Sequence, residues 1–310
     1  MSIPVVLLFS GQGAQKIGMG SELAAQSPAA AALFAEARAT LNFDLTTVMA
    51  DGPAETLTRT SYCQPALYLH GLAALAALRE KVPGLQVAAC AGLSLGEFTA
   101  HAAAGTFSFA DGLRLVAARG RFMDEACAET EGAMAAMIGG EESAVRELAA
   151  ECDVDVANLN APGQIVLSGS KEGIAQAIDG AKAKGIRMGK ALQVAGAYHS
   201  RLMKSAQEKL AVELASAAIA VPSVPVISNV TAQPASDPAE IRRTLEAQVT
   251  GSVRWSESMQ ALISQGRTVF LELGPGGVLS GLMGRIDKTA TVHAIEDSAS
   301  LEKAAAALAG

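Results

Sequence analysis

The stretch VAACAGLSLG, residues 87–96, decides the fold, because it passes from a strand into a helix across a single turn. Residues 87–93 are small and apolar, which is typical of a strand covered on both faces. Residues 95–104 follow directly with the composition of a helix. A serine on such a turn exposes its hydroxyl, and the flanking glycines let the strand and helix approach closely. The stretch therefore predicts an α/β fold with Ser94 as a candidate nucleophile.

The GxSxG spacing alone leaves a second interpretation open, a glycine-packed turn without chemistry. In a chain with 30 glycines the pattern arises by chance roughly 0.2 times. The strand–turn–helix context favours the nucleophile. In that context the amide of Leu95, at the helix N-terminus, points to where an oxyanion would form.

Further segments extend the same pattern in both directions. Residues 5–9 and 268–273 are short apolar runs that predict buried strands, and residues 66–78 and 111–127 predict helices, the latter with Asp111 as N-cap. Short buried strands alternating with helices indicate a mostly parallel sheet between helices. The Ala-rich residues 301–310 predict a terminal helix or a frayed end.

One segment has a different order, β-α-β-β-α-β, which is the ferredoxin-like arrangement. Its elements are strand 133–138, helix 141–151, strand 155–160, strand 164–168, helix 171–184 and strand 187–194. We therefore expect a small subdomain, residues 130–196, inserted into a larger α/β subdomain formed by residues 1–129 and 197–310.

Composition excludes several classes of function. The net charge is −7 and no run of basic residues occurs, so the chain lacks the charge pattern of a nucleic-acid groove. The longest apolar stretch, residues 62–78, contains Gln64, Pro65 and His70, so we expect a buried helix and no membrane span.

Four cysteines without CxxC spacing argue against a zinc site and a disulfide framework. The N-terminus has no basic region typical of a signal peptide. We expect a cytoplasmic protein with no metal site. The glycine turns match neither GxGxxG nor a Walker motif, and we expect no bound cofactor.

Four histidines could act as the base for Ser94. His101 lies seven residues further along the helix, about 10 Å away, and His70 lies in an apolar helix where a core histidine is expected. His199 lies where a strand gives way to a helix, a position favoured for catalysis, and is preferred. A capping role for His199 stays open. His293 as base would instead indicate an ordinary α/β-hydrolase, an esterase or thioesterase.

Arg119 differs from its neighbours in the helix 111–127. Arg114 and Arg121 have acidic residues at helical spacing, which predicts solvated ion pairs. Arg119 instead has Leu115, Val116, Phe122 and Met123 at those spacings and therefore faces inward. A buried guanidinium needs a partner, so it either pairs with a distant acid or awaits an anionic ligand, and carboxylate is a good match.

Ordered motifs extend over nearly the whole chain. They are FSGQGAQ (9–15), QPAL (64–67), GLSLGEF (92–98), RGRFM (119–123), NAPGQ (160–164), YHS (198–200), VRW (253–255) and ELGPG (272–276). With them the chain resembles malonyl-CoA:acyl carrier protein transacylases of bacterial fatty acid synthesis and the acyltransferases of polyketide synthases. Two positions depart from the family pattern: Leu93 replaces the usual His, and Ser10 the usual Pro.

The resemblance implies an α/β-hydrolase-like large subdomain with a ferredoxin-like small one, and roles for particular residues. Ser94 is the implied nucleophile, His199 its base, and Arg119 the ligand of the malonyl carboxylate. The amides of Gln12 and Leu95 would form the oxyanion hole. A main-chain carbonyl near Arg254 would orient the histidine. The substrate-binding residues would also include Gln64, Met123, Tyr198, Asn160 and Gln164.

The implied reaction is a ping-pong transfer of malonyl from malonyl-CoA to the phosphopantetheine thiol of acyl carrier protein. Tyr198 before the histidine indicates malonyl over methylmalonyl by the same resemblance. A protein with this fold but no chemistry stays a further alternative. Because carrier proteins are generally acidic, docking needs a local basic patch. The candidates are Lys182, Lys184, Arg187, Lys190, Arg201 and Lys204.

Overall fold

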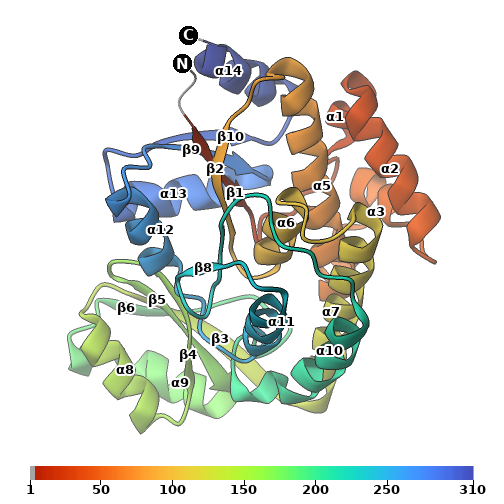
Figure 1. Ribbon diagram of the computed structural model, residues 1–310. Helices are drawn as coiled ribbons and strands as arrows, with labels where there is room; N and C mark the ends of the chain where they lie inside the picture. Colours follow the sequence, from red (N-terminus) through yellow and green to blue (C-terminus); the bar gives the residue numbers. More distant parts are fainter. Residues whose placement is uncertain (1–3, 310) are drawn as a thin grey trace.

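The computed structural model describes residues 4–309, which form two sheets with helices packed around them (Figure 1). The larger sheet has six strands in the order β10-β9-β1-β2-β7-β8. Neighbouring strands are parallel except β8, which is antiparallel to β7. The strands are β1 (Val5–Phe9), β2 (Val87–Gly92), β7 (Val226–Ile227), β8 (Pro234–Ala235), β9 (Val269–Leu273) and β10 (Thr291–Ile295).

The central strand β1 is buried on both faces, which explains its continuous apolar run. Val5, Leu7 and Phe9 pack on the side of the long helices α5 (Thr60–Lys81) and α7 (Phe109–Glu129). Val6 and Leu8 pack on the opposite side, against residues of helices α12 (Trp255–Ser264) and α13 (Val278–Ile286). Figure 1 shows these two helix layers on either side of the sheet.

The remaining helices complete the larger unit. They are α1 (Ser21–Gln26), α2 (Pro28–Thr40), α3 (Leu45–Asp51), α4 (Ala54–Thr58), α6 (Leu95–Ala103), α10 (Lys204–Ser216), α11 (Pro238–Ala247), α12 (Trp255–Ser264), α13 (Val278–Ile286) and α14 (Ser298–Ala309). The prediction of Asp111 as N-cap is wrong. Ser108 caps α7, because its hydroxyl accepts a hydrogen bond from the Asp111 amide at 3.1 Å.

The smaller sheet is antiparallel, with the order β4-β5-β3-β6 that a ferredoxin-like arrangement requires. Its elements follow the predicted sequence of strands and helices: β3 (Gly132–Ile138), α8 (Glu142–Glu151), β4 (Asp155–Ala161), β5 (Gln164–Ser170), α9 (Lys171–Gly180) and β6 (Met188–Ala191). It has its own aliphatic core. The predicted fold class is confirmed, whereas the exact subdomain boundaries stay a prediction.

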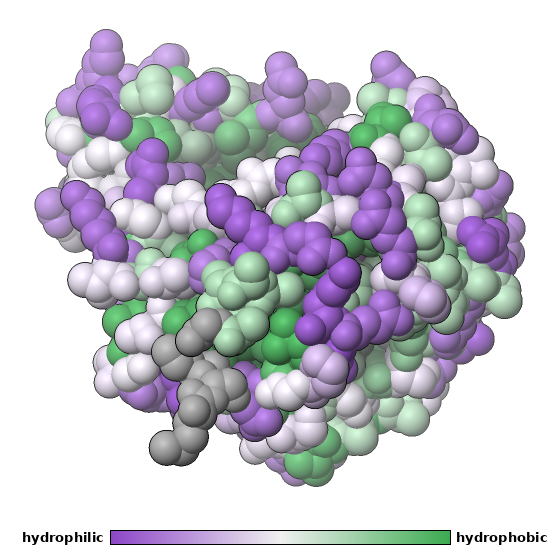
Figure 2. All heavy atoms as spheres, turned by 90° about the horizontal axis from the view of Figure 1, so that it is seen from above, coloured by the Kyte–Doolittle hydropathy of each residue, from purple (hydrophilic) through white to green (hydrophobic). Residues whose placement is uncertain are grey.

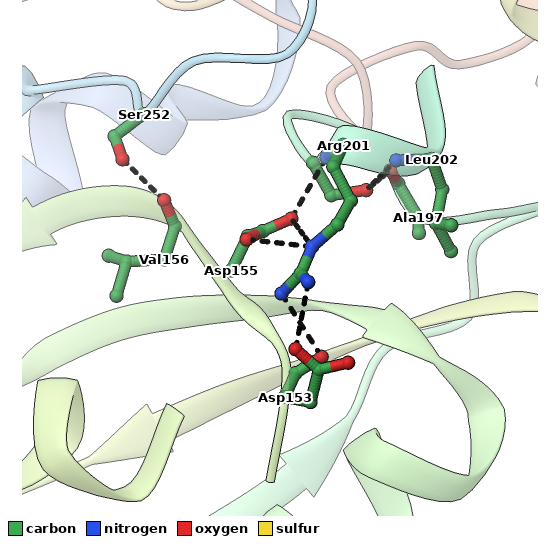
Figure 3. Close-up of polar contacts among 8 residues, drawn as sticks. Asp153, Asp155, Val156, Ala197, Arg201, Leu202 and Ser252 are labelled. Atoms are coloured by element: carbon green, nitrogen blue, oxygen red, sulfur yellow. Dashed lines mark hydrogen bonds and ion pairs between the residues drawn. The ribbon is translucent and has the colours of Figure 1, made fainter. Parts of the chain in front are cut away.

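Strand β4 joins the smaller sheet to two segments of the larger unit (Figure 3). The backbone of Val253 exchanges hydrogen bonds with Ala157 at 2.8 Å and Leu159 at 2.9 Å. The guanidinium and amide of Arg201 bind Asp155, with an amide-to-carboxylate distance of 2.8 Å. These contacts fix the segments just after residues 199 and 248 against the same strand.

The surface carries both polar and apolar groups (Figure 2). Figure 2 shows hydrophilic groups interspersed with neutral and hydrophobic ones over one face of the molecule. Within residues 4–309 no helix has the length and apolar character needed to cross a membrane. All four cysteines are free.

Candidate active site

Ser94 lies on a sharp turn between β2 and α6, as the sequence predicts. Its backbone has φ 55° and ψ −113°, a conformation that non-glycine residues rarely adopt. The two glycines make this turn possible: a Cβ on Gly92 would lie 1.9 Å from the backbone of Gly96, and one on Gly96 would lie 2.1 Å from the carbonyl oxygen of Phe9. The turn therefore lifts the Ser94 hydroxyl out of the strand.

His199 lies beside this hydroxyl. Its Nε2 is 2.8 Å from Ser94 Oγ, and its Nδ1 is 2.9 Å from the carbonyl oxygen of Gln248. Because a carbonyl can only accept, Nδ1 carries the proton and Nε2 is free to accept from Ser94. Burial, and secondly the charge of Arg119, lower the pKa of His199 to about 4. The imidazole is therefore neutral near pH 7 and able to act as a base.

The predicted orienting carbonyl at Arg254 is wrong, because Gln248 supplies it. Gln248 is the C-cap of α11, where the last carbonyls of a helix lack intrahelical partners. The Arg254 carbonyl instead accepts hydrogen bonds from Ser258, at 3.0 Å from its amide and 2.8 Å from its hydroxyl. The Arg254 side chain pairs with Glu257.

Arg119 is buried at 1% exposure and reaches the nucleophile. Its Nη2 donates to Ser94 Oγ at 3.2 Å and to Gln248 Oε1 at 2.9 Å, and its Nη1 donates to Gln64 Oε1 at 2.7 Å. Among residues 4–309, these acceptors include no carboxylate. Burial lowers the pKa of Arg119 to about 10, so the group stays cationic at neutral pH. Of the two alternatives, the structure favours a site for an anionic ligand.

The neighbouring arginines behave as predicted. Arg114 pairs with Asp111 at 2.9 Å and Arg121 with Glu125 at 3.8 Å, all on the exposed side of α7. The contrast with Arg119 confirms that helical spacing alone separates the inward guanidinium from the solvated ones.

The two predicted oxyanion amides lie at the ends of neighbouring strands. Leu95 is the first residue of α6, so its N–H has no acceptor within the helix. Gln12 follows β1 in the turn at residues 10–13 and lines the same cavity as Ser94. Their role toward an oxyanion stays a prediction. Ser10, at the departure from the family pattern, donates its hydroxyl to Glu272 at 3.3 Å.

A cavity of about 200 Å³ opens onto Ser94 and His199. Of the predicted substrate-binding residues, it is lined by Gln64, Met123, Tyr198 and Asn160, and the oxyanion candidate Gln12 also lines it. Arg119 and Gln164 are not among the lining residues; Gln164 begins β5 opposite Ile138, two residues before the cavity-lining Val166. Residues that the sequence did not indicate also line it: Met134, Asn158, Val166, Leu192, Val194, Val278 and Leu282.

The other histidines are distant from the nucleophile. His70 is buried and its Nε2 contacts the carbonyl of Glu296 at 3.1 Å, as expected for a core histidine. His101 contacts the hydroxyl of Thr106 at 3.1 Å. His293 lies on β10, which β9 and β1 separate from β2. The hydrolase alternative with His293 as base is therefore wrong.

Three residues around Ser94 were not assigned a role from sequence. Asn229 accepts from the Ser94 amide at 2.7 Å and donates to the carbonyl of Gly92 at 2.8 Å. Gln248 supplies the carbonyl for His199, and the buried Glu97 binds the Gln248 side chain at 2.6 Å. The sequence contains a signal for Glu97, because an acidic residue stands out in an apolar helix. Asn229 and Gln248 lie in distant segments that carry no comparable sequence signal.

Half of the candidate basic patch is engaged in ion pairs. Lys184 pairs with Glu147 and Glu151, Arg201 with Asp153 and Asp155, and Lys204 with Glu208. Within residues 4–309, Lys182, Arg187 and Lys190 form no ion pair, so they remain the candidates for binding an acidic partner.

Comparison with known proteins agrees with this geometry. The model of the acyl transferase domain matches residues 6–301. The chain belongs to the acyl transferase domain family. Among its relatives, the malonyl CoA-acyl carrier protein transacylase of Bacillus subtilis (strain 168) is 43% identical over 305 residues, covering 97% of this chain and 96% of that protein. The Escherichia coli (strain K12) protein of the same name is 40% identical over 301 residues, covering 96% and 97%.

Solved structures of the family share the whole fold of this acyltransferase. The acyl-carrier-protein-S-malonyltransferase of Bartonella henselae superposes with a TM-score of 0.94 at 37% identity, covering 99% of this chain and 100% of that one. A malonyl-transacylase solved in complex with its type II PKS acyl-carrier protein has a TM-score of 0.93 at 37% identity, covering 98% and 100%.

Proposed function

We propose that this acyltransferase moves a malonyl group from malonyl-CoA to the phosphopantetheine thiol of an acyl carrier protein, through an ester on Ser94. The observation that carries the proposal is the buried Arg119 guanidinium, 3.2 Å from Ser94 Oγ and hydrogen-bonded to no carboxylate within residues 4–309. A cation held beside the nucleophile suits an acyl group that ends in a free carboxylate. The names of the relatives point to the same substrate and acceptor.

In the first half-reaction, Ser94 Oγ attacks the thioester carbonyl of malonyl-CoA while His199 Nε2 takes its proton. The 2.8 Å separation of these atoms suits direct transfer. The amides of Gln12 and Leu95 would stabilise the tetrahedral oxyanion. The C–S bond then breaks, and the proton on His199 passes to the CoA sulfur, which leaves as the thiol.

In the second half-reaction, the carrier protein thiol takes the place of CoA. His199 removes its proton as the sulfur attacks the ester carbonyl, and the same amides would receive the oxyanion. The C–O bond to Ser94 breaks, and Ser94 Oγ recovers the proton from His199. The hydroxyl and imidazole return to their starting state, so the cycle is a ping-pong reaction.

Selectivity would follow from the charge of Arg119. A malonyl group on Ser94 carries its carboxylate toward the guanidinium, whereas an acetyl group would leave a buried cation without a charged partner. Sites built to bind a polar group strongly disfavour the analogue that lacks it.

The malonyl thioester on the carrier protein would supply fatty acid elongation, which consumes such two-carbon donors. As proposed, the reaction uses the CoA thioester as substrate and needs no metal or cofactor. Lys182, Arg187 and Lys190 are the proposed contacts for the acidic carrier protein. The cytoplasmic location expected from the cysteines stays part of this proposal.

The test is intact-mass measurement after incubation with malonyl-CoA or acetyl-CoA. We expect a malonyl adduct on the wild type and none on Ser94→Ala. In Arg119→Ala, the malonyl rate should fall and the acetyl rate should gain relative to it. A wild type without adduct would support the non-enzymatic alternative, and an unchanged malonyl rate in Arg119→Ala would contradict the assigned carboxylate site.

A further inference from the structure

Glu97 is a buried carboxylate directly beneath the site, with 0% of its surface exposed. It lies in the first turn of α6, three residues after Ser94. Its Oε2 accepts two hydrogen bonds, from Gln248 Nε2 at 2.6 Å and from the amide of Asn229 at 3.0 Å. Its Oε1 is buried without a partner. The reaction steps above do not use this group.

Gln248 connects Glu97 to the reacting residues. Its Oε1 accepts from Arg119 Nη2 at 2.9 Å, and its Nε2 donates to the Ser94 carbonyl at 2.9 Å as well as to Glu97. Its own carbonyl accepts from His199. One residue therefore contacts the nucleophile, the base and the guanidinium.

A carboxamide has two orientations, which exchange its oxygen and its NH2 group. The observed orientation places the oxygen against Arg119. The reversed one would place the NH2 group against the guanidinium, donor against donor, and the oxygen against two acceptors, Glu97 Oε2 and the Ser94 carbonyl. Removing the Glu97 acceptor would weaken this preference and release the Gln248 side chain.

We propose that Glu97 is a positioning residue for substrate selection, which acts by fixing the Gln248 side chain so that its oxygen holds Arg119 toward the acyl group on Ser94. The inference rests on the proposed function, because it concerns how Arg119 is held for a carboxylate. His199 depends on the backbone carbonyl of Gln248, so loss of the side-chain contact affects malonyl more than an acyl group without a carboxylate.

The role as proposed requires an acceptor at Oε2. Both hydrogen bonds end on Oε2, which leaves Oε1 free to carry a proton. Burial raises the pKa of Glu97 to about 7, which agrees with a group that is protonated in part at neutral pH. Glutamine at this position keeps an acceptor at Oε2 and places its NH2 group at Oε1, so it mimics the protonated acid.

The experiment compares Glu97→Gln, Glu97→Met and Gln248→Met. For each, the rates of Ser94 acylation by malonyl-CoA and by acetyl-CoA are followed by intact mass. We expect Glu97→Gln to keep the malonyl rate within about threefold. Glu97→Met should lower the malonyl rate about 10- to 100-fold, which corresponds to one hydrogen bond to a charged group, and the acetyl rate less than about threefold.

Gln248→Met keeps the backbone carbonyl for His199 and removes the acceptor for Arg119, so it should repeat the malonyl-specific loss even if Glu97→Met does not fold. Equal losses for both acyl groups in Glu97→Met and Gln248→Met would overturn the inference, as would a Glu97→Gln variant as impaired as Glu97→Met. A wild type that forms no malonyl adduct would instead overturn the proposed function.

Discussion

The turn that carries the nucleophile and the segment that follows the base are held by two different kinds of contact. Ser94 is fixed within one buried core by the glycine turn and by two hydrogen bonds: its amide donates to Asn229, and its carbonyl accepts from Gln248. The segment just after His199 is fixed across two sheets by charges at the surface: Arg201 binds Asp155 with side chains 55% and 30% exposed (Figure 3).

This difference means that the two sides respond to different conditions. Buried hydrogen bonds are insensitive to salt, whereas exposed ion pairs are screened and contribute little each. The distance between Ser94 and His199 therefore depends on buried contacts around the Ser94 turn and on surface ion pairs just after His199. Each set of contacts can be perturbed separately.

The largest expected effect comes from filling the turn on the Ser94 side. In Gly96→Ala the new Cβ would lie 2.1 Å from the Phe9 carbonyl oxygen, so β1 and α6 must separate. We expect the free energy of unfolding to fall by at least about 3 kcal/mol, measured by urea denaturation.

The matched control is Gly281→Ala in α13, where a Cβ meets nothing within 4 Å. It should be neutral or stabilising by up to about 1 kcal/mol. Equal effects of the two variants would contradict close packing at the turn.

Removing the base is the next largest effect and compares the two histidines. His199→Ala should slow Ser94 acylation by about 10²- to 10⁴-fold, since a general base contributes that much. His293→Ala, three strands away from β2, should leave the rate unchanged. Quenched-flow measurements of Ser94 acylation in both variants test this prediction. A larger loss of rate in His293→Ala would contradict the assignment of His199 as the base.

Lowering the pH should reduce the free energy of unfolding through the buried histidines. Burial lowers the pKa of His70 and His199 to about 4 and of His101 to about 3, while the unfolded chain protonates them near 6.5. Between about pH 6.5 and 4 the unfolded state binds more protons, so stability falls as pH falls, by about 1.4 kcal/mol per pH unit for each histidine.

Glu97 makes the opposite contribution to the pH dependence of stability. Its pKa is raised to about 7 by burial, so the folded state binds this proton before the unfolded state does, and the contribution cancels that of about one histidine. Urea denaturation at pH 6.5 and 5 measures the net slope. Replacing His101, whose ring contacts Thr106 and Phe107, should flatten that slope without changing acylation at pH 7. A slope that His101→Phe leaves unchanged would mean that this histidine is not buried in its neutral form.

The smallest expected effect is on the surface side. Arg201→Ala removes the bonds to Asp153 and Asp155 and should lower acylation by less than about tenfold, with wild-type rates that decline as salt rises. Arg146→Ala is the control, because Arg146 lines the same surface hollow as Arg201 and, among residues 4–309, pairs with Glu142 of its own helix. Indistinguishable rates for both variants would mean that the surface contact does not position His199.

Much of the fold was predictable because local patterns determine it. Strand β1 has the predicted bounds, and the order of the small sheet follows from alternating strand and helix periodicity. Ser94 and Arg119 were also accessible, since glycines bracket the first and apolar residues surround the second at helical spacing.

The contacts that complete the site were not predictable in the same way. Gln248 acts through a backbone carbonyl, which every residue possesses, so Arg254 was chosen wrongly. Asn229 reaches Ser94 from 135 positions away, and only the packing of β7 beside β2 brings it there. Gln164 was assigned to the substrate by motif alone, but at the start of β5 it does not line the cavity.

The chain enters the small sheet and returns from it to the larger unit at neighbouring positions. A Cβ on Gly132 would lie 2.6 Å from the backbone nitrogen of Ala197, so the segment that leads into the small sheet contacts the segment that leads out of it. Because its two ends lie close together, the inserted unit can be replaced by the corresponding unit of a relative. Because Asn158, Asn160 and Val166 of that unit line the cavity, a chimaera would replace part of the cavity wall while retaining the host's nucleophile and its Arg119 guanidinium.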